Sequence, residues 1–157
     1  MSEPEILREI LERTLVRYLD VRPGGLLVDD RLHPEKDALV SSFAGARTLY
    51  RGRKPFCRSL DGVKAIQSGK FCNECHERKH CTPQVRVDLL LDDRPFRLLL
   101  SFTSAKNFLL YASRLKRDGS SVEAVTTRIR VLDRGSWGEL RFTRVGTEPS
   151  PPSENRP

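Results

Sequence analysis

The sequence predicts a mainly β fold with α structure, in which five strands and one helix follow an acidic N-terminal segment. Three observations predict it. Strand-like segments with period-two alternation follow one another in the C-terminal half, one segment there has helical spacing, and turn-forming residues separate them. If a strand that precedes the cysteines is included, the helix falls between the third and fourth strands. This is the element order of an OB-fold, so we expect an OB-like five-stranded barrel.

The N-terminal part is predicted to contain one helix, over residues 4–19. Its apolar residues lie at helical spacing, at Ile6, Ile10, Leu11, Leu15 and Leu19, before Pro23-Gly24-Gly25 ends the segment. We expect this helix to pack back on the body or to bind a protein partner. Residues 21–40 look like a connecting stretch with a short strand at 25–28, and residues 42–51 are predicted as the first strand of the barrel.

The segments after the cysteines are regular. The predicted strands are 85–91, 96–103, 122–132 and 137–145. Phe102 is expected on the inner face of its strand, in alternation with Phe96, Leu98 and Leu100. Asp92-Asp93 is predicted as a turn, and Ser104 as the cap of a helix that has Phe108 on its apolar side and ends near Gly119.

Length and composition fit one main domain, residues 41–146, preceded by an N-terminal helix and connector, 1–40, and followed by a disordered tail, 147–157. Residues 1–40 carry nine acidic and six basic side chains, a net of −3. Residues 41–157 carry twelve acidic and twenty-two basic ones, a net of +10, which indicates an anionic partner such as a phosphate backbone. No apolar run could span a bilayer, so we expect an intracellular (cytoplasmic) protein with no membrane partner.

All four cysteines lie within 25 residues, in the spacing C-x14-C-x2-C-x5-C; they are Cys57, Cys72, Cys75 and Cys81. A C-x2-C pair turns two thiolates toward one ion, and the flanking cysteines complete the tetrahedron that zinc accepts. We therefore expect one structural zinc ion in an inserted loop, residues 54–82. Two disulfides and a redox-active C-x-x-C are the alternatives, and His76 or His80 could replace one cysteine as a ligand.

No pattern of catalytic residues points to an enzyme. A zinc site with four protein ligands is closed and activates no water, so a zinc hydrolase would require one cysteine not to be a ligand. Phosphate-binding glycine motifs and a Ser/His/Asp arrangement are not recognisable in the sequence. We expect a protein that is not an enzyme.

Basic and aromatic residues gather around the cysteines, since residues 51–80 carry eight basic and three acidic side chains. Single-strand binders combine a basic groove with aromatic rings on which bases stack. Arg128, Arg130 and Arg141 are expected on one outer strand face, where the like charges would cost stability unless an anion or a carboxylate such as Glu139 offsets them. The predicted nucleic-acid-binding residues are Tyr50, Arg53, Lys54, Phe56, Arg58, Lys70, Phe71, Arg128, Arg130 and Arg141. For Phe56 and Phe71 the alternative is packing around the zinc ion.

Five features of the sequence occur together: CRSLDG (57–62), CNEC (72–75), Cys81, VTTRIRV (125–131) and, as the most specific, TSAKNF (103–108). In these features the chain resembles a family of small phage and prophage proteins, which are taken for zinc-containing, single-stranded-DNA-binding-like proteins of the OB type. The similarity covers about residues 45–132, and the chain departs from the family in the short interval before its last cysteine.

The resemblance implies DNA binding. Together with the basic and aromatic residues, it leads us to expect binding of single-stranded DNA, or of RNA, with little sequence preference. The alternative function is a zinc-containing interaction subunit of a larger protein–nucleic-acid assembly, which docks through the helix over residues 4–19.

Overall fold

The structure is a computed structural model that describes residues 2–7 and 16–146. Residues 3–7 are helical, but Arg17–Tyr18 form strand β1, so the helix predicted over 4–19 does not reach its expected end. Pairing with another strand and the burial of Leu19, which donates its N–H to the Arg97 carbonyl at 2.8 Å, outweigh the helical spacing there. The rest of that helix and the predicted tail at 147–157 lie outside the described residues.

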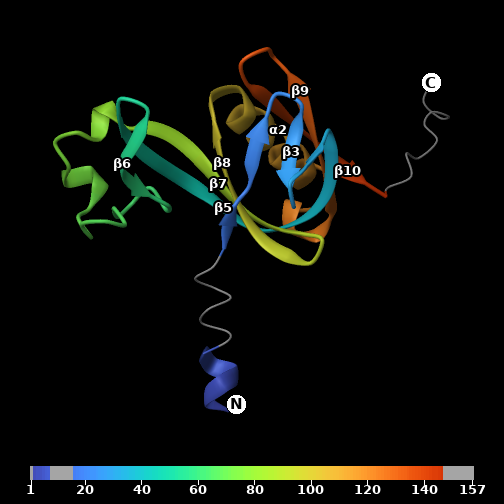
Figure 1. The fold of residues 1–157 in the computed structure, drawn as a ribbon, viewed down its shortest axis with the longest axis horizontal. Coiled ribbons are helices and arrows are strands. Elements are labelled where there is room, and N and C mark those ends of the chain that lie inside the picture. The colour runs from blue at the N-terminus through green and yellow to red at the C-terminus, as the bar shows by residue number, and fades with distance from the viewer. Residues whose placement is uncertain (1, 8–15, 147–157) are drawn as a thin grey trace.

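A seven-stranded open sheet forms the main layer, in the order β1-β8-β7-β5-β9-β10, with β6 paired to the end of β5 (Figure 1). The strands are β5 (Glu35–Arg51), β6 (Lys54–Ser59), β7 (Thr82–Leu91), β8 (Arg94–Ser101), β9 (Thr126–Asp133) and β10 (Gly138–Val145). β5 pairs first with β9, then with β7 and β6, and a bulge lies between Val40 and Ser42. Within the described residues no pairing joins β8 to β10, so the sheet does not close on itself.

A second, three-stranded antiparallel sheet precedes β5; it consists of β2 (Asp20–Arg22), β3 (Gly25–Val28) and β4 (Arg31–His33). The sequence predicts only the middle strand. Leu26 and Val28 are buried in the same hydrophobic cluster as the main sheet, so this segment is part of the core. Gly25 makes the tight pairing possible, because a Cβ there would lie 2.3 Å from the His33 carbonyl oxygen.

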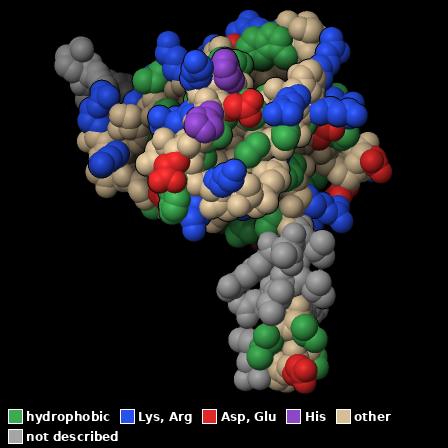
Figure 2. Space-filling model, turned by 90° about the vertical axis from the view of Figure 1, so that its left-hand side faces the viewer, with side chains coloured by type: hydrophobic (Ala, Val, Ile, Leu, Met, Phe, Trp, Pro, Cys, Tyr) green, Lys and Arg blue, Asp and Glu red, His purple; other side chains and the backbone are tan. Residues whose placement is uncertain are grey.

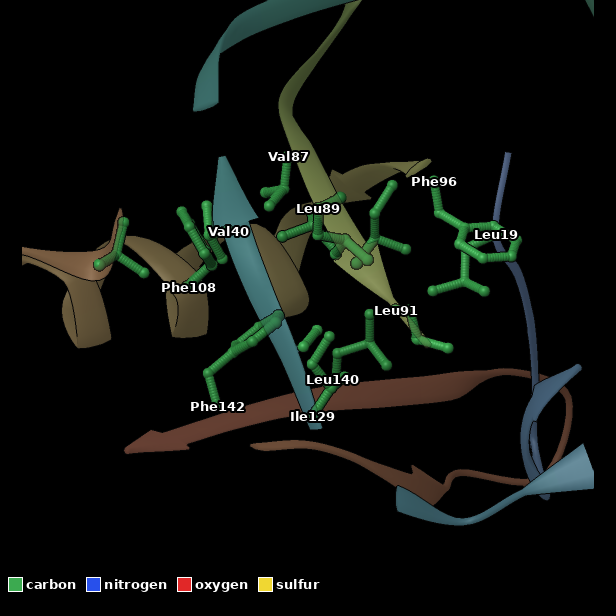
Figure 3. Packing of buried hydrophobic residues seen from close by; sticks show 14 of the residues in the cluster. Leu19, Val40, Val87, Leu89, Leu91, Phe96, Phe108, Ile129, Leu140 and Phe142 are labelled. Carbon is green, nitrogen blue, oxygen red and sulfur yellow. The ribbon is translucent and has the colours of Figure 1, made fainter. Parts of the chain in front are cut away.

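Helix α2 (Phe102–Arg117) connects β8 to β9 and packs against β10. Figure 3 shows its Phe108 pointing toward the strands, among side chains that come from the sheet. Phe108 is completely buried and makes edge-to-face contacts with Phe43 and Phe142, each at a ring-centroid distance of 5.2 Å. After α2 a short 3-10 turn (Val122–Ala124) precedes β9, so the strand predicted from residue 122 begins four residues later.

The junction between β8 and α2 differs from the prediction. Phe102 is 77% exposed and adopts φ +48, because the chain leaves β8 here and turns into the helix. Ser101 occupies the N-cap position, and the buried Ser104 lies in the first turn instead. The predictions of Phe102 as an inner-face residue and of Ser104 as the cap are therefore wrong.

Ser104 and Asn107 connect α2 to the edge of β10. The Leu140 N–H donates to Ser104 Oγ at 3.0 Å, and Asn107 Nδ2 donates to the Leu140 carbonyl at 2.9 Å. These bonds satisfy backbone groups that a neighbouring strand would otherwise pair. The TSAKNF stretch thus has a structural role: its side chains hold the helix against the open edge.

None of the helices in the described ranges is both long and apolar enough to cross a membrane.

Candidate functional site

The cysteine-bearing segment between β6 and β7 extends from one end of the sheet, at the left of Figure 1. Two contacts fix its start. Arg86 Nη1 donates to the Leu60 carbonyl at 3.0 Å, and the Asp61 carboxylate accepts the backbone N–H groups of Val63 (2.8 Å) and Lys64 (3.0 Å). The Lys64 and Val63 N–H groups hold the pKa of Asp61 below its ordinary value.

All four cysteines line one cavity of about 60 Å³. Cys57 lies on β6, and Cys72 and Cys75 belong to a 3-10 turn in which the Cys75 N–H donates to the Cys72 carbonyl at 3.1 Å. Cys81 follows a second such turn, which starts at Arg78. Residues that are up to 24 positions apart in the sequence (57 to 81) therefore face the same small space.

The thiols face one cavity without forming a closed coordination sphere. Across the described residues, no group of three or more His, Cys, Asp or Glu side chains is arranged to hold a metal ion. All four cysteines are free thiols. Burial raises the pKa of Cys57 and Cys81, and the neighbouring cysteines raise it further.

The surroundings of the cavity bear on the ligand alternatives. His76 and His80 are exposed and do not line it. Lys70 and Arg78 line it, as does Arg47, which the sequence did not single out and which opposes the rise in the pKa of Cys81. In Figure 2, which views this end of the molecule, Lys and Arg side chains spread over the surface with His side chains among them.

Next to this segment, a group of polar and charged side chains lies on the outer face of the sheet, on β1, β5, β6, β7 and β8. We call it the polar face; its residues are Tyr18, Thr48, Arg58, Gln84, Arg86, Asp88 and Arg97. Strand register places Ser42, Asp88 and Arg97 in one row across the sheet, with Tyr18 paired beside Arg97. Three arginines and one carboxylate give this face a positive charge.

Hydrogen bonds fix the side chains of the polar face. Arg58 Nε donates to Thr48 Oγ1 at 3.2 Å, and the buried Thr48 hydroxyl donates to Gln84 Oε1 at 2.6 Å. The Arg58 guanidinium lies 5.4 Å from the centre of the Tyr18 ring. Farther along β7, Arg97 Nε donates to Asp88 Oδ1 at 2.8 Å. These contacts hold the side chains of the polar face in fixed positions, as in a binding surface that exists before the ligand binds.

Arg86 belongs to the polar face and also contacts the cysteine-bearing segment. Its Nε lies 3.4 Å from Asp88 Oδ2, yet it is buried and has no hydrogen-bond partner among the described residues. Its Nη1 is the donor that holds the Leu60 carbonyl. Arg86 therefore links the polar face to the cysteine-bearing segment.

The predicted residues near the cysteines lie at the end of β5, on β6 and in the segment that follows. Arg53 and Lys54 are exposed in the β5–β6 hairpin, and the Tyr50 hydroxyl accepts a bond from Gln84 Nε2 at 3.4 Å. Phe56 and Phe71 are each 44% exposed, and neither lines the cysteine cavity. The Arg51 guanidinium lies 3.6 Å from the centre of the Phe56 ring, and Lys64 Nζ lies 5.0 Å from that of Phe71. Each of the two rings therefore lies beside a cation and outside the cysteine cavity.

Arg128, Arg130 and Arg141 lie elsewhere, on the outer face of β9 and β10. Arg141 pairs directly opposite Arg130, which confirms the expected like-charge pair, and Arg141 Nε donates to Glu139 Oε2 at 2.6 Å. Along β5, Arg58 is opposite residue 48 and Arg128 opposite residue 37. Eleven residues of strand span up to about 36 Å, so the predicted binding residues divide into two groups.

Glu139 carries the strongest pKa shift in the described chain. Hydrogen bonds from Arg141, Asn107 and Arg134 lower its pKa from 4.5 to about 2. A carboxylate with a depressed pKa stabilises the fold above its unfolded-state pKa, and this contribution is lost as the pH falls toward 2. We expect Glu139→Gln to flatten the decrease in stability between about pH 5 and pH 2, measured by urea unfolding. Glu123→Gln, at an exposed glutamate, is the control; an unchanged pH profile in Glu139→Gln would contradict the assignment.

Of the seven residues of the polar face, the sequence analysis predicted only Arg58 as a binding residue. Arg86 and Arg97 alternate with buried residues on β7 and β8, so the period-two pattern carried the signal that could have found them. Tyr18 carried no such signal, because the helical spacing of residues 4–19 assigned it to a helix.

Comparisons with protein families, with curated proteins and with solved structures gave no match to this chain.

Proposed function

We propose that this chain is a non-enzymatic, zinc-stabilised protein that binds single-stranded nucleic acid, DNA before RNA, with little sequence preference. The polar face beside the cysteine-bearing segment carries the proposal. It combines arginines with an exposed tyrosine ring, the pairing of charge and stacking surface that single-strand binders use.

The strand order supports an OB-like architecture. Strands β5, β7, β8, β9 and β10, with α2 between β8 and β9, follow the OB order, and the long β5 pairs with both β7 and β9. In OB-folds the face of the second and third strands and the loop after the first strand bind oligonucleotides. Here these are the outer face of β7 and β8 and the cysteine-bearing segment. The proposed interface therefore lies where an OB-like domain would bind a strand.

The donor set supports zinc. Cys57, Cys72, Cys75 and Cys81 supply four sulfur ligands, the set that structural zinc prefers, and they already line one cavity. Lys70 and Arg78 at its wall offset the charge of a zinc tetrathiolate. A zinc ion bound there would hold the segment in shape beside the polar face and, with four protein ligands, would leave no position for a reacting water.

Tyr18 provides the sharpest test of the interface. It is 48% exposed, and Arg58 and Arg97 flank it. Stacking of a base on an aromatic ring contributes about 1–3 kcal/mol, so Tyr18→Ala is expected to weaken binding of single-stranded DNA roughly 5- to 150-fold. Tyr18→Phe keeps the ring and should bind like the wild type. Fluorescence anisotropy with single-stranded DNA, duplex DNA and RNA of equal length measures both.

Salt dependence and a surface control complete the experiment. Arg53→Gln is expected to reduce the salt dependence of binding, since each phosphate contact contributes to that slope. Lys106→Gln, on the exposed side of α2, is the matched control. Equal affinity of Tyr18→Ala and wild type would remove the polar face from the proposal. If the wild type binds no nucleic acid at low salt, the interaction-subunit function replaces it.

A further inference from the structure

A second cationic site lies at the other end of β5, between α2 and the outer face of β9 and β10. It is a pocket of about 590 Å³, within the range of pockets that hold nucleotide-sized ligands. Four arginines line it: Arg114 from α2, Arg128 and Arg130 from β9, and Arg141 from β10. Among the described residues, Glu35 is the one carboxylate in the wall.

The charges of this pocket are only partly compensated. Arg128 is paired with Asp37 at 2.9 Å and with Glu35 at 3.5 Å, and Arg141 is paired with Glu139 at 2.6 Å. Within the described part of the chain, Arg114 and Arg130 have no ion-pair partner. Arg114 from α2 and Arg130 from β9 therefore line the same pocket, and among the described residues no carboxylate forms an ion pair with either guanidinium.

The like-charge pair across β9 and β10 also indicates a site for an anion. Arg130 and Arg141 are directly opposite in the β9–β10 register, an arrangement that destabilises a sheet unless an anion lies between the charges. Glu139 engages Arg141 and Arg134. Glu35 is opposite Arg130 in the β5–β9 register, but its ion pair is with Arg128 at 3.5 Å, so neither carboxylate forms an ion pair with Arg130. An anionic ligand in the pocket would do so.

The rest of the wall suggests the size and kind of that anion. Leu110, Leu132 and Phe142 form an apolar part beside the arginines, and Tyr111 adds a ring whose hydroxyl is engaged with Thr127 at 2.8 Å. Guanidinium groups match phosphate oxygens with paired hydrogen bonds. A group that is anionic at one end and apolar at the other fits such a wall better than a small inorganic ion.

We propose that this pocket binds a phosphate-bearing ligand of nucleotide size, with Arg114 and Arg130 as the main phosphate ligands. The ligand is a free mononucleotide or the phosphorylated end of a strand, which share this chemistry. The site goes beyond the proposed function, because none of its lining residues belongs to the polar face. Along β5, Arg128 is opposite residue 37, whereas the polar-face residue Asp88 is opposite residue 42.

Calorimetric titration of the full-length protein with dTMP, thymidine and inorganic phosphate tests the pocket. dTMP should bind, thymidine should not, and inorganic phosphate should bind more weakly than dTMP. Arg130→Gln and Arg114→Gln are each expected to weaken dTMP binding about tenfold or more, since each removes a charge-assisted contact. Arg117→Gln, an exposed arginine at the end of α2 and outside the pocket, should have no effect.

Oligonucleotides that differ only in a 5′-phosphate distinguish the two sources. A preference for the phosphorylated oligonucleotide that Arg130→Gln abolishes assigns the pocket to strand ends, and dTMP binding without such a preference assigns it to free nucleotides. Tyr18→Ala should leave dTMP binding unchanged, so failure of the polar face and failure of the pocket are separable. The proposal is overturned if dTMP does not bind, or if Arg130→Gln and Arg114→Gln bind it like Arg117→Gln. Thermal melts check that the variants fold.

Discussion

Replacement of any one of Cys57, Cys72, Cys75 or Cys81 by serine is expected to abolish zinc binding at the proposed site and to leave the body of the fold intact. The loss of a thiolate opens the coordination sphere, which should lower zinc affinity on the order of a hundredfold or more. The body (residues 16–51 and 82–146) has its own core, because no residue of its hydrophobic cluster comes from the cysteine-bearing segment. Metal loss should therefore be local.

Two measurements on the full-length protein check this expectation. Elemental analysis should find one zinc per chain in the wild type and substoichiometric zinc in each serine variant. Hydrogen exchange with and without a chelator should show faster exchange in residues 54–82, with β7, β8 and α2 unchanged. The readout is independent of nucleic-acid binding.

His76→Ala and His80→Ala are the matched controls, since both histidines are exposed and lie outside the cavity. Both variants should retain the metal. If one of them loses zinc while a serine variant keeps it, the ligand set contains that histidine and three cysteines. If the purified wild type contains no zinc and none can be added, the metal proposal fails.

The sequence predicted the regular part of the fold because its patterns there are local. The alternation in β7 to β10 and the apolar side of α2 follow from burial of one face, so each strand and the helix appear close to their expected positions. The placement of Arg141 opposite Arg130 was predictable for the same reason, since register across a tight turn follows from counting residues.

The remaining parts depend on contacts between distant residues. Tyr18 lies in a strand because β1 pairs with the edge of β8. The residues close to Tyr18 in the sequence carry no information about this pairing. Ser104 has the residue type and position of a cap, yet the Leu140 N–H needs an acceptor at the open edge of β10. In both places a tertiary hydrogen bond outweighs a local preference.

Phe102 and Phe108 allow a quantitative test of how far local sequence patterns predict burial. The sequence predicts both rings to be buried, but only Phe108 is buried in the structure. Phe108→Ala is expected to destabilise the protein by about 3–5 kcal/mol, since it removes a fully buried ring and leaves a cavity between Phe43 and Phe142. This is a large share of the stability of a domain of this size, so the midpoint of urea unfolding should fall sharply.

Phe102→Ala, six residues earlier in the same helix, is the matched control. Its ring is exposed, so its removal should change the free energy of unfolding by less than about 0.5 kcal/mol. Phe102→Gly should stabilise the protein, because glycine adopts the φ of +48 without strain and the position is the first of the helix. Equal destabilisation by Phe102→Ala and Phe108→Ala would mean that β8 continues through residue 102 and that the helix begins later, as the alternation alone predicts.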